Sequence, residues 1–518
     1  MAEQLEPLPG SAAELQRFAD LQRRLPPMYR RLYSDPKEAR TVVVVPSLSF
    51  DTAEMEKITG VLHYEERMLC LLMLLHLPRT HLVYVTSLKL DPAIVDYYLH
   101  LLPGVPTAHA RKRLTLLSCD DARLTPLTQK VLERPDLLER LRTVVGDPAT
   151  SHMSCFNTTA LERTLAVQLG IPLYGCDPAL NHLGSKSMSR RTFREANILL
   201  PDGYEEIRDR TKLAQALADL KARNPALRSA VVKLNDSFSG EGNALFSFDG
   251  LASDPRELAD ALPGHLRFEA ANETWDHYEA KLGQMGGIVE SLIEGAQVRS
   301  PSVQFRIDPL GEIHLVSTHD QVLGGPRGQV YLGCRFPADA AYRHELHEAG
   351  MEVARLLRRK GVLGRFAIDF VSVLGDDGWK HYALEINLRK GGTTIPYLTL
   401  EFLTNGDYDP DTGLYHTRTG QVRGYYATDN LTKREYVGLV PEELIDLMVF
   451  WDLHWDATSQ QGVVFHLMGA VTEHGKLGLL AVAEDTESAE RLYASTVATL
   501  DRATAASVTA RAATPVPP

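Results

Sequence analysis

The stretch that most constrains this 518-residue chain is FAIDFVSVLGDDGWKHYALEINLRKGG, which runs from Phe366 to Gly392. Two segments with strand-like patterning flank a Gly-Asp-Asp-Gly sequence, which supplies the positive-φ positions that a hairpin turn requires. Folding at this turn places Asp369 opposite Glu385, to within one residue of register. Because side chains alternate along a strand, Asn387 and Arg389 follow Glu385 on the same face.

A cluster of oxygen ligands is therefore expected on one face of this hairpin, from Asp369, Glu385 and Asn387. The simpler interpretation is a strand with one solvated face. However, Asp369 interrupts an otherwise apolar strand, where an unpaired carboxylate is unfavourable. Oxygen ligands without Cys or His suit Mg²⁺, which proteins usually hold with one or two carboxylates together with substrate phosphates. The hairpin thus predicts a Mg²⁺–nucleotide site.

Composition and charge exclude several classes of function. The chain is 44% hydrophobic and 24% charged, which is ordinary for a soluble globular protein. A net charge of −12 and the lack of a basic stripe argue against nucleic-acid binding. Five cysteines without CxxC pairs argue against a zinc site or a disulfide framework, and for a reducing compartment. The polar N-terminus and the shortness of the apolar run 68–77 predict a cytoplasmic protein without a membrane segment.

Strand and helix patterns alternate in the first third of the chain. Apolar strands over Thr41–Val45, His81–Val85 and Arg113–Leu117 are separated by helical patterns over Tyr64–Leu77 and Asp91–Leu102, which predicts a parallel sheet wrapped by helices. This region lacks GxGxxG and GxxxxGKS motifs. The predicted domains are a helical leader (1–40), an α/β domain (41–180), a small lobe with a lid (181–290), a large lobe with the metal hairpin (291–434), a C-terminal α+β extension (435–500) and a disordered tail (501–518).

Two lysines and a glycine-rich loop are candidates for binding phosphates. Lys186 lies at a loop-to-helix junction, and Lys233 ends an apolar strand, where a lysine is unfavourable unless it meets an anion. The loop that follows contains Ser239, Gly240 and Gly242, and it can direct backbone N–H groups at phosphate oxygens. An ordinary hairpin turn is the alternative interpretation of this loop.

The segment from Gly287 to Gly295 has the pattern of a strand that runs into a linker between two lobes. Its free backbone groups after Glu290 could pair with an adenine edge, while Leu292 and Ile293 enclose the ring. A strand that ends in a bulge would give the same pattern.

The order of these features resembles the ATP-grasp superfamily over about 180–400. Its most specific part is Glu385-x-Asn387-x-Arg389 with the upstream Asp369. The resemblance implies an α/β protein in which two α+β lobes clamp ATP, preceded by an α/β pre-ATP-grasp domain and followed by a small α+β extension. The finer resemblance is to carboxylate–amine ligases of the pheganomycin type, through the stretches Tyr64–Arg67, Leu101–Gly104, Gly184–Ser187, Ser317–Gln321 and Val464–Gly469.

Members of this superfamily phosphorylate a carboxylate to an acyl phosphate, which an amine attacks to give an amide, ADP and phosphate. The resemblance implies roles in this chain for phosphate-binding residues (Lys186, Lys233), lid-loop residues (Ser239, Gly240, Gly242), adenine-binding residues (Glu290, Leu292, Ile293), Mg²⁺ ligands (Asp369, Glu385, Asn387) and a catalytic arginine (Arg389). Gln297 stands where the family often has an acidic residue for the ribose hydroxyls.

Substrate-binding residues are less constrained. The segment Ser317–Arg335 reads as a long polar loop, and Arg306 and Arg335 are candidates for binding a substrate carboxylate or the acyl phosphate. Surface arginines on solvated strands are the alternative interpretation.

The leading hypothesis is an ATP- and Mg²⁺-dependent peptide ligase of natural-product biosynthesis that acts on small-molecule or peptide substrates, with a homodimer possible. The alternatives are an ATP-grasp enzyme with a thiol or phosphoryl acceptor, and a nucleotide-binding regulatory protein.

Overall fold

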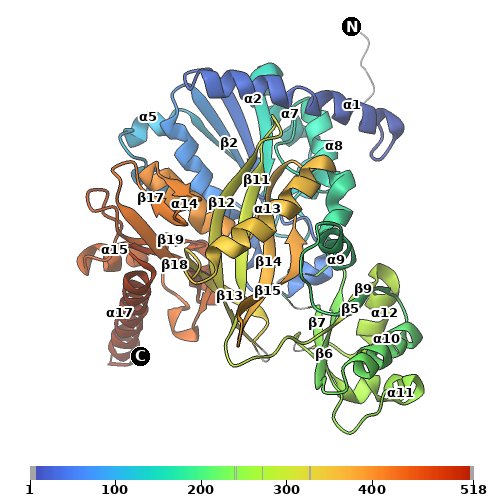
Figure 1. Ribbon diagram of the computed structural model, residues 1–518. Coiled ribbons are helices and arrows are strands. Elements are labelled where there is room, and N and C mark those ends of the chain that lie inside the picture. Colours follow the sequence, from blue (N-terminus) through green and yellow to red (C-terminus); the bar gives the residue numbers. More distant parts are fainter. Residues whose placement is uncertain (1–6, 238–239, 241, 271, 326–327, 514–518) are drawn as a thin grey trace, which may run out of the picture.

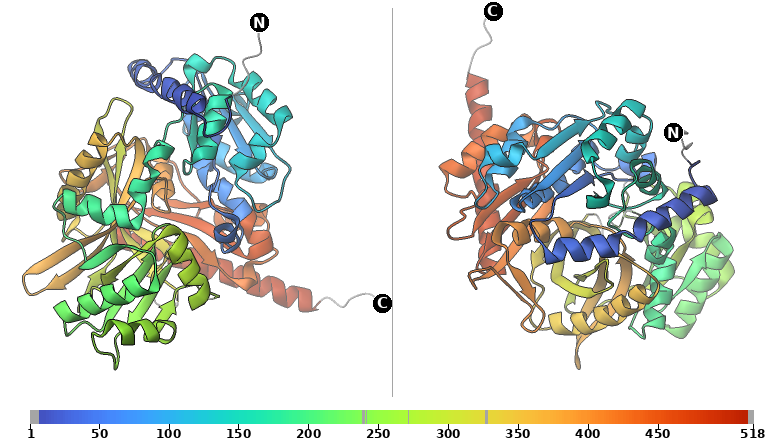
Figure 2. Two further views of the ribbon diagram at one scale, coloured as in Figure 1. Left: turned by 90° about the vertical axis from the view of Figure 1, so that its right-hand side faces the viewer. Right: turned by 90° about the horizontal axis from the view of Figure 1, so that it is seen from above.

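The computed structural model describes residues 7–513 except 238–239, 241, 271 and 326–327. The chain forms an N-terminal domain, a small lobe and a large lobe (Figures 1 and 2). Residues of all three line one central cleft. The mixed α/β class expected from the sequence is confirmed. Among the described residues, no helix is both long and apolar enough to cross a membrane.

The N-terminal domain contains a parallel four-stranded sheet in the order β3-β2-β1-β4. Its strands are β1 (Arg40–Val45), β2 (Thr80–Thr86), β3 (Leu114–Ser118) and β4 (Ser151–Cys155). The sequence predicts the first three strands and their parallel arrangement. It does not predict β4, because the segment SHMSC lacks the apolar, β-branched residues that mark the other strands.

Helices connect and cover these strands. They are α1 (Ala12–Gln22), α2 (Leu25–Ser34), α3 (Thr52–Glu56), η1 (Val61–His76), α4 (Pro92–His100), α5 (Thr107–Arg111), α6 (Leu127–Leu132), α7 (Pro135–Val145), η2 (Pro148–Thr150), α8 (Ala160–Leu169) and η3 (Pro178–Gly184). The segment η1, expected as a buried helix, is wound as a 3₁₀ helix. Thr159 and Glu162 form a capping box at the start of α8, and Gly170 ends this helix at φ +67°.

The small lobe is an antiparallel sheet in the order β5-β9-β6-β7-β8, with helices packed against it in a separate core. Its elements are α9 (Lys186–Glu195), β5 (Gly203–Ile207), α10 (Arg210–Arg223), β6 (Ser229–Leu234), β7 (Asn243–Ser247), α11 (Pro255–His265), β8 (Leu266–Phe268), α12 (Trp275–Met285) and β9 (Gly287–Ser291). This lobe projects at the lower right of Figure 1.

The large lobe is organised on an antiparallel sheet of eleven strands. Its elements are β10 (Val298–Arg299), β11 (Pro301–Ile307), β12 (Ile313–Gly324), β13 (Val330–Phe336), α13 (Arg343–Arg359), β14 (Gly364–Gly375), β15 (Gly378–Asn387), α14 (Thr394–Thr404), β16 (Asp407–Asp409), β17 (Leu414–His416), β18 (Val422–Thr432), η4 (Arg434–Tyr436), α15 (Pro441–Phe450), β19 (Gly462–His466), α16 (Gly469–His474), β20 (Lys476–Ala483) and α17 (Thr486–Ala513).

The C-terminal α+β extension expected over 435–500 is continuous with the large lobe. Strand β20 pairs with β18, and β19 pairs with β20, so both strands extend the large sheet. One hydrophobic core includes Met68 of η1, Leu400 of α14 and Leu479 of β20. Segments far apart in sequence therefore share a single core between the N-terminal domain and the large lobe.

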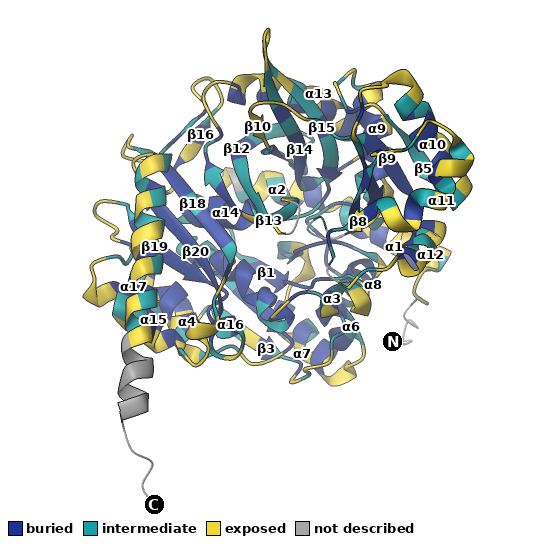
Figure 3. Cartoon of the chain, turned by 90° about the horizontal axis from the view of Figure 1, so that it is seen from below, coloured by how far each residue is buried: buried dark blue, intermediate teal, exposed yellow. Residues whose placement is uncertain are grey.

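The expected disordered tail over 501–518 is wrong for residues 501–513, which continue α17; residues 514–518 lie outside the described residues. Alanine favours helix, and Asp501 accepts hydrogen bonds from Lys433 Nζ and Tyr436 Oη, both at 2.7 Å. Figure 3 shows α17 along the large lobe with an exposed outer side.

The expected long polar loop over Ser317–Arg335 is also wrong. Strands β12 and β13 occupy most of it and pair with each other in the large sheet. Gly325 and Gly328 lie in the short connection between the two strands, whereas Gly324 ends β12 and Gly333 lies within β13. Residues 326–327 lie outside the described residues.

Docking of α17 is testable through Leu500, which is 0% exposed in the shared core. We expect Leu500→Ala to cost about 2–5 kcal/mol, because it leaves a cavity at the contact between α17 and the sheet. The matched variant Leu8→Ala, at a leucine that is 78% exposed, should change stability by less than about 0.5 kcal/mol. Thermal unfolding midpoints compare the two, and equal midpoints would contradict the docked position of α17.

Candidate active site

Strands β14 and β15 form the hairpin expected from the sequence. Asp369 pairs with Glu385 in the register, and Gly375 pairs with Gly378 at the turn. The side-chain amide of Asn387 donates hydrogen bonds to Asp369 Oδ2 at 2.9 Å and to Glu385 Oε1 at 3.2 Å. These bonds leave the amide oxygen of Asn387 available beside two carboxylates, which is a donor set that suits Mg²⁺.

The two carboxylates have different electrostatic surroundings. Burial raises the pKa of the Asp369 carboxyl, and the neighbouring charge of Glu385 raises this pKa further. Burial would also raise the pKa of Glu385, but the ammonium groups of Lys186 and Lys233 outweigh it and lower this pKa. Two acidic groups held face to face in this way favour a divalent cation, because the cation stabilises both in their ionised form.

The predicted phosphate-binding lysines approach this hairpin from the small lobe. Lys186, the first residue of α9, places Nζ 2.9 Å from Glu385 Oε2. Lys233 on β6 pairs with Glu290 on the adjacent strand β9. The other carboxylate oxygen of Glu290 lies 2.9 Å from Arg190 Nη1. Glu290 is thus fixed between two cations and holds Lys233 at the wall of the cleft.

The central cleft has a volume of 390 Å³, within the usual range of ligand pockets. The predicted residues that line it are Lys186, Lys233, Gly240, Glu290, Leu292, Ile293, Asp369, Glu385, Asn387 and Arg389. Gly240 has φ +83°, and a Cβ atom there would lie 2.5 Å from the carbonyl oxygen of Gln329, so this position requires glycine. Gly242 does not line the cleft, and its carbonyl oxygen accepts from Leu234 N–H at 3.1 Å. Ser239 lies outside the described residues.

Besides Gly242, three predicted residues of the described chain do not line the cleft. Gln297 is exposed, and its carbonyl oxygen accepts from Leu374 N–H at 3.1 Å. Arg335 pairs with Glu490 of α17. Arg306 interacts electrostatically with Tyr174 of the N-terminal domain. The reason is geometric, because an arginine on a strand reaches only the face to which its Cβ points, and the sequence does not say which face borders the cleft.

The cleft contains an ion pair that the sequence interpretation missed. Arg67 of η1 places Nη1 3.1 Å from Asp429 Oδ2 of β18, and its guanidinium lies over the rings of Tyr64 at 4.2 Å and Phe156 at 4.6 Å. Arg67 is only 3% exposed, and its Nη2 has no hydrogen-bond partner among the described residues. The run Glu65-Glu66-Arg67 inside an apolar helical segment was the available signal, because buried charges need a partner or a function.

Comparison with known proteins agrees with this geometry. Residues 178–262 and 251–410 match a family model described as IQCH-like, ATP-grasp, and residues 443–496 match one described as PGM1 C-terminal domain. The chain is 31% identical over 464 residues to an L-propargylglycine–L-glutamate ligase of Streptantibioticus cattleyicolor, which covers 87% of this chain and 92% of the relative. It is 22% identical over 513 residues to the IQ motif-containing protein H of Danio rerio, covering 88% of this chain and 48% of that protein.

Solved structures show the same fold. The ADP complex of N5-carboxyaminoimidazole ribonucleotide synthetase matches with a TM-score of 0.51 and 11% identity, over 90% of this chain and 98% of the other. Biotin carboxylase from Campylobacter jejuni matches with a TM-score of 0.51 and 12% identity, over 88% and 89%. Together with the ligase relative, these findings confirm the family recognised in the sequence: the chain belongs to the ATP-grasp superfamily and is an ATP-dependent carboxylate–amine ligase of the pheganomycin-type group.

Proposed function

We propose that this ligase activates the carboxylate of a small amino acid or short peptide and joins it to the amine of a second amino acid. The relative at 31% identity is named for the ligation of two amino acids, L-propargylglycine and L-glutamate, which supports this class of substrate. The expected homodimer, cytoplasmic location and individual residue roles remain predictions.

The observation that carries the proposal is the position of Arg67 and Asp429 in the same cleft as the carboxylate hairpin. Near Arg67, Lys476 donates to Tyr64 Oη at 2.9 Å and is itself buried. Lys476 also lies close enough to Asp429 to interact with it electrostatically. Two buried cations therefore lie near one carboxylate, and this local excess of positive charge suits a substrate carboxylate. Asp429 offers an anion for a substrate ammonium group, so the pair can recognise both charged groups of an amino acid.

In the proposed reaction, the residues around the carboxylate hairpin hold ATP, and the residues around Arg67 and Asp429 hold the amino-acid substrate. ATP supplies the phosphoryl group, and Mg²⁺ offsets the charge on its phosphates. In our proposal, Lys186 and Lys233 hold the phosphates, and Asp369, Glu385 and Asn387 hold the cation. A substrate carboxylate oxygen takes the γ-phosphoryl group and ADP is released. The amine nitrogen then bonds to the acyl carbon and loses a proton, while the bond from this carbon to the phosphate oxygen breaks.

Arg389 is the residue best placed to serve both steps. It follows the β14–β15 hairpin, lines the cleft, and interacts electrostatically with Glu385 and Asp369. Its guanidinium can stabilise the transferring phosphoryl group and then the acyl phosphate.

The proposed function is tested by ADP release against a panel of amino acids, dipeptides and small carboxylates, offered singly and in pairs, with mass detection of products. We expect ADP, phosphate and an amide in equal amounts for at least one pair of amino acids. ADP release that yields a thioester or a phosphorylated product, with no amide, would contradict the proposal.

Removal of either metal-binding carboxylate should abolish turnover without unfolding the protein. We expect Asp369→Asn and Glu385→Gln each to lower Mg²⁺-dependent ADP release by at least about 100-fold, because the cation loses a charged ligand. Thermal midpoints should stay close to that of the wild type. Arg335→Ala, which removes a charge outside the cleft, is the control and should retain turnover. Wild-type rates in either carboxylate variant would exclude the metal assignment.

Substitution of the Arg67–Asp429 pair should weaken binding of the amino-acid substrate and spare ATP. We expect Arg67→Lys and Asp429→Asn each to raise the amino-acid KM at least about tenfold, since a bidentate or paired contact is lost. The KM for ATP should change less than about twofold. Arg306→Lys is the matched control outside the cleft. A selective rise in the KM for ATP would instead assign the pair to the nucleotide.

A further inference from the structure

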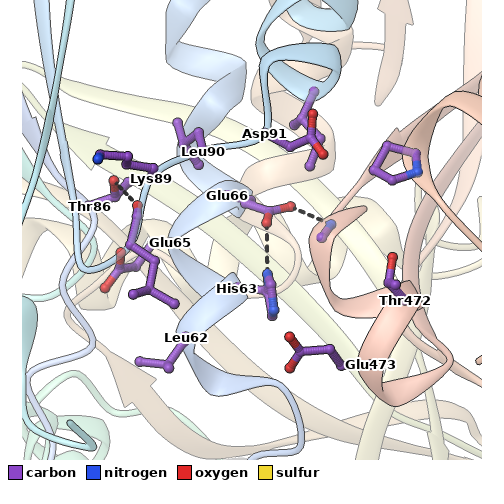
Figure 4. Close-up of a pocket in the computed structure, with 14 residues that line it drawn as sticks. Leu62, His63, Glu65, Glu66, Thr86, Lys89, Leu90, Asp91, Thr472 and Glu473 are labelled. Carbon is purple, nitrogen blue, oxygen red and sulfur yellow. Dashed lines mark hydrogen bonds and ion pairs between the residues drawn. The ribbon is translucent and has the colours of Figure 1, made fainter. Parts of the chain in front are cut away.

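A second cavity, of 240 Å³, lies between the N-terminal domain and the C-terminal segment (Figure 4). It shares no lining residue with the ATP cleft. Residues of η1, of the loop before α4 and of α16 line it. The catalytic proposal uses none of these residues, so the cavity requires an explanation of its own.

Three side chains with metal-binding atoms meet beside this cavity. His63 comes from η1, and Glu473 and His474 end α16. One potential ligand atom from each lies within 4.8 Å of the others. The rings of His63 and His474 meet edge to face with centroids 6.2 Å apart, and His474 Nε2 lies 3.7 Å from Glu473 Oε2. About 410 residues of chain separate the two elements that supply these groups.

The orientation of His63 is fixed by a buried carboxylate. Glu66 is 4% exposed, and its Oε1 lies 3.0 Å from His63 Nδ1. Its other oxygen accepts from Gly469 N–H at 2.9 Å. Figure 4 shows Glu66 between these two partners, with Glu473 near the imidazole of His63. Histidine ligands of metals usually donate one ring N–H to a carboxylate in this way, which leaves the second nitrogen free to bind the metal.

Two glycines leave room for this arrangement. A Cβ atom at position 469 would lie 2.1 Å from Glu66 Oε1 and 2.5 Å from His63 Nδ1. A Cβ atom at Gly60 would lie 3.1 Å from the His474 ring, and Gly60 also has φ +71°. Any side chain at Gly469 would displace the Glu66–His63 pair, so the backbone of α16 is part of the site.

We propose that His63, Glu473 and His474 bind a divalent transition-metal ion, with Zn²⁺ as the best match. Two imidazoles and one carboxylate are a common zinc donor set, whereas Mg²⁺ and Ca²⁺ prefer oxygen ligands only. Ligands bound to zinc lie roughly 3.4 Å apart at bond lengths of about 2.1 Å. The exposed Glu473 side chain can close the remaining distance. The donor set contains no cysteine, so cysteine spacing gives no sign of it.

Metal binding at this site would join η1 to α16. Because η1 also carries Tyr64 and Arg67, which line the central cleft, the ion would hold this part of the cleft wall against the C-terminal segment. An ion that binds the folded chain more tightly than the unfolded chain also stabilises the fold.

Zinc binding to the 518-residue chain, kept saturated with Mg²⁺ and ADP, tests the site. After equilibrium dialysis with micromolar ZnCl₂, we expect one Zn²⁺ per chain by elemental analysis and a rise in the thermal midpoint. His474→Ala and Glu473→Gln should each weaken zinc binding at least about tenfold and abolish the rise. The control His109→Ala, at an exposed histidine, should behave as the wild type.

The two variants keep the test valid if one of them folds poorly, because Glu473 is 72% exposed and its replacement by glutamine preserves its shape. Asp369→Asn should retain the bound zinc, which separates this site from the ATP cleft. Unchanged zinc affinity in both site variants, or no bound zinc in the wild type, would overturn the proposal.

Discussion

The candidate active site depends on two carboxylates, Asp369 and Glu385, that face each other across one hairpin. Like charges at this separation in a partly buried site repel each other unless cations lie beside them. The small lobe supplies one such cation, because Lys186 reaches Glu385 across the cleft. Asn387 bonds to both carboxylates and keeps them side by side. In our proposal, a bound Mg²⁺ completes this arrangement by stabilising both carboxylates in their ionised form.

The rest of the fold positions the end of the cleft where we propose that the amino-acid substrate binds. The N-terminal domain contributes Arg67, and strand β18 contributes Asp429. These residues meet because η1, α14 and β20 share one hydrophobic core, and this core joins the N-terminal domain to the C-terminal part of the chain. The C-terminal segment therefore helps to hold Arg67 and Asp429 in place in the cleft. In our proposal a metal ion at His63 strengthens this same contact.

Local features were predictable from the sequence, and long-range ones were not. The Gly-Asp-Asp-Gly turn and the alternation after it define the register of the hairpin, so Asp369 and Glu385 were placed correctly. Arg306 and Arg335 were misplaced, because strand periodicity identifies two faces without showing which one borders the cleft. Arg67 and Asp429 lie 362 residues apart, and no local pattern connects them. Their contact follows from the packing of η1 against the large lobe.

The most direct measurement is a crystal structure of the protein with ADP and Mn²⁺, recorded at the manganese absorption edge. We expect an anomalous peak between Asp369, Glu385 and Asn387, about 2.1 Å from their oxygen atoms. We also expect ADP phosphates within hydrogen-bonding distance of Lys186 and Lys233. A nucleotide bound elsewhere, or manganese without contact to Asp369 and Glu385, would exclude the proposed Mg²⁺–nucleotide site.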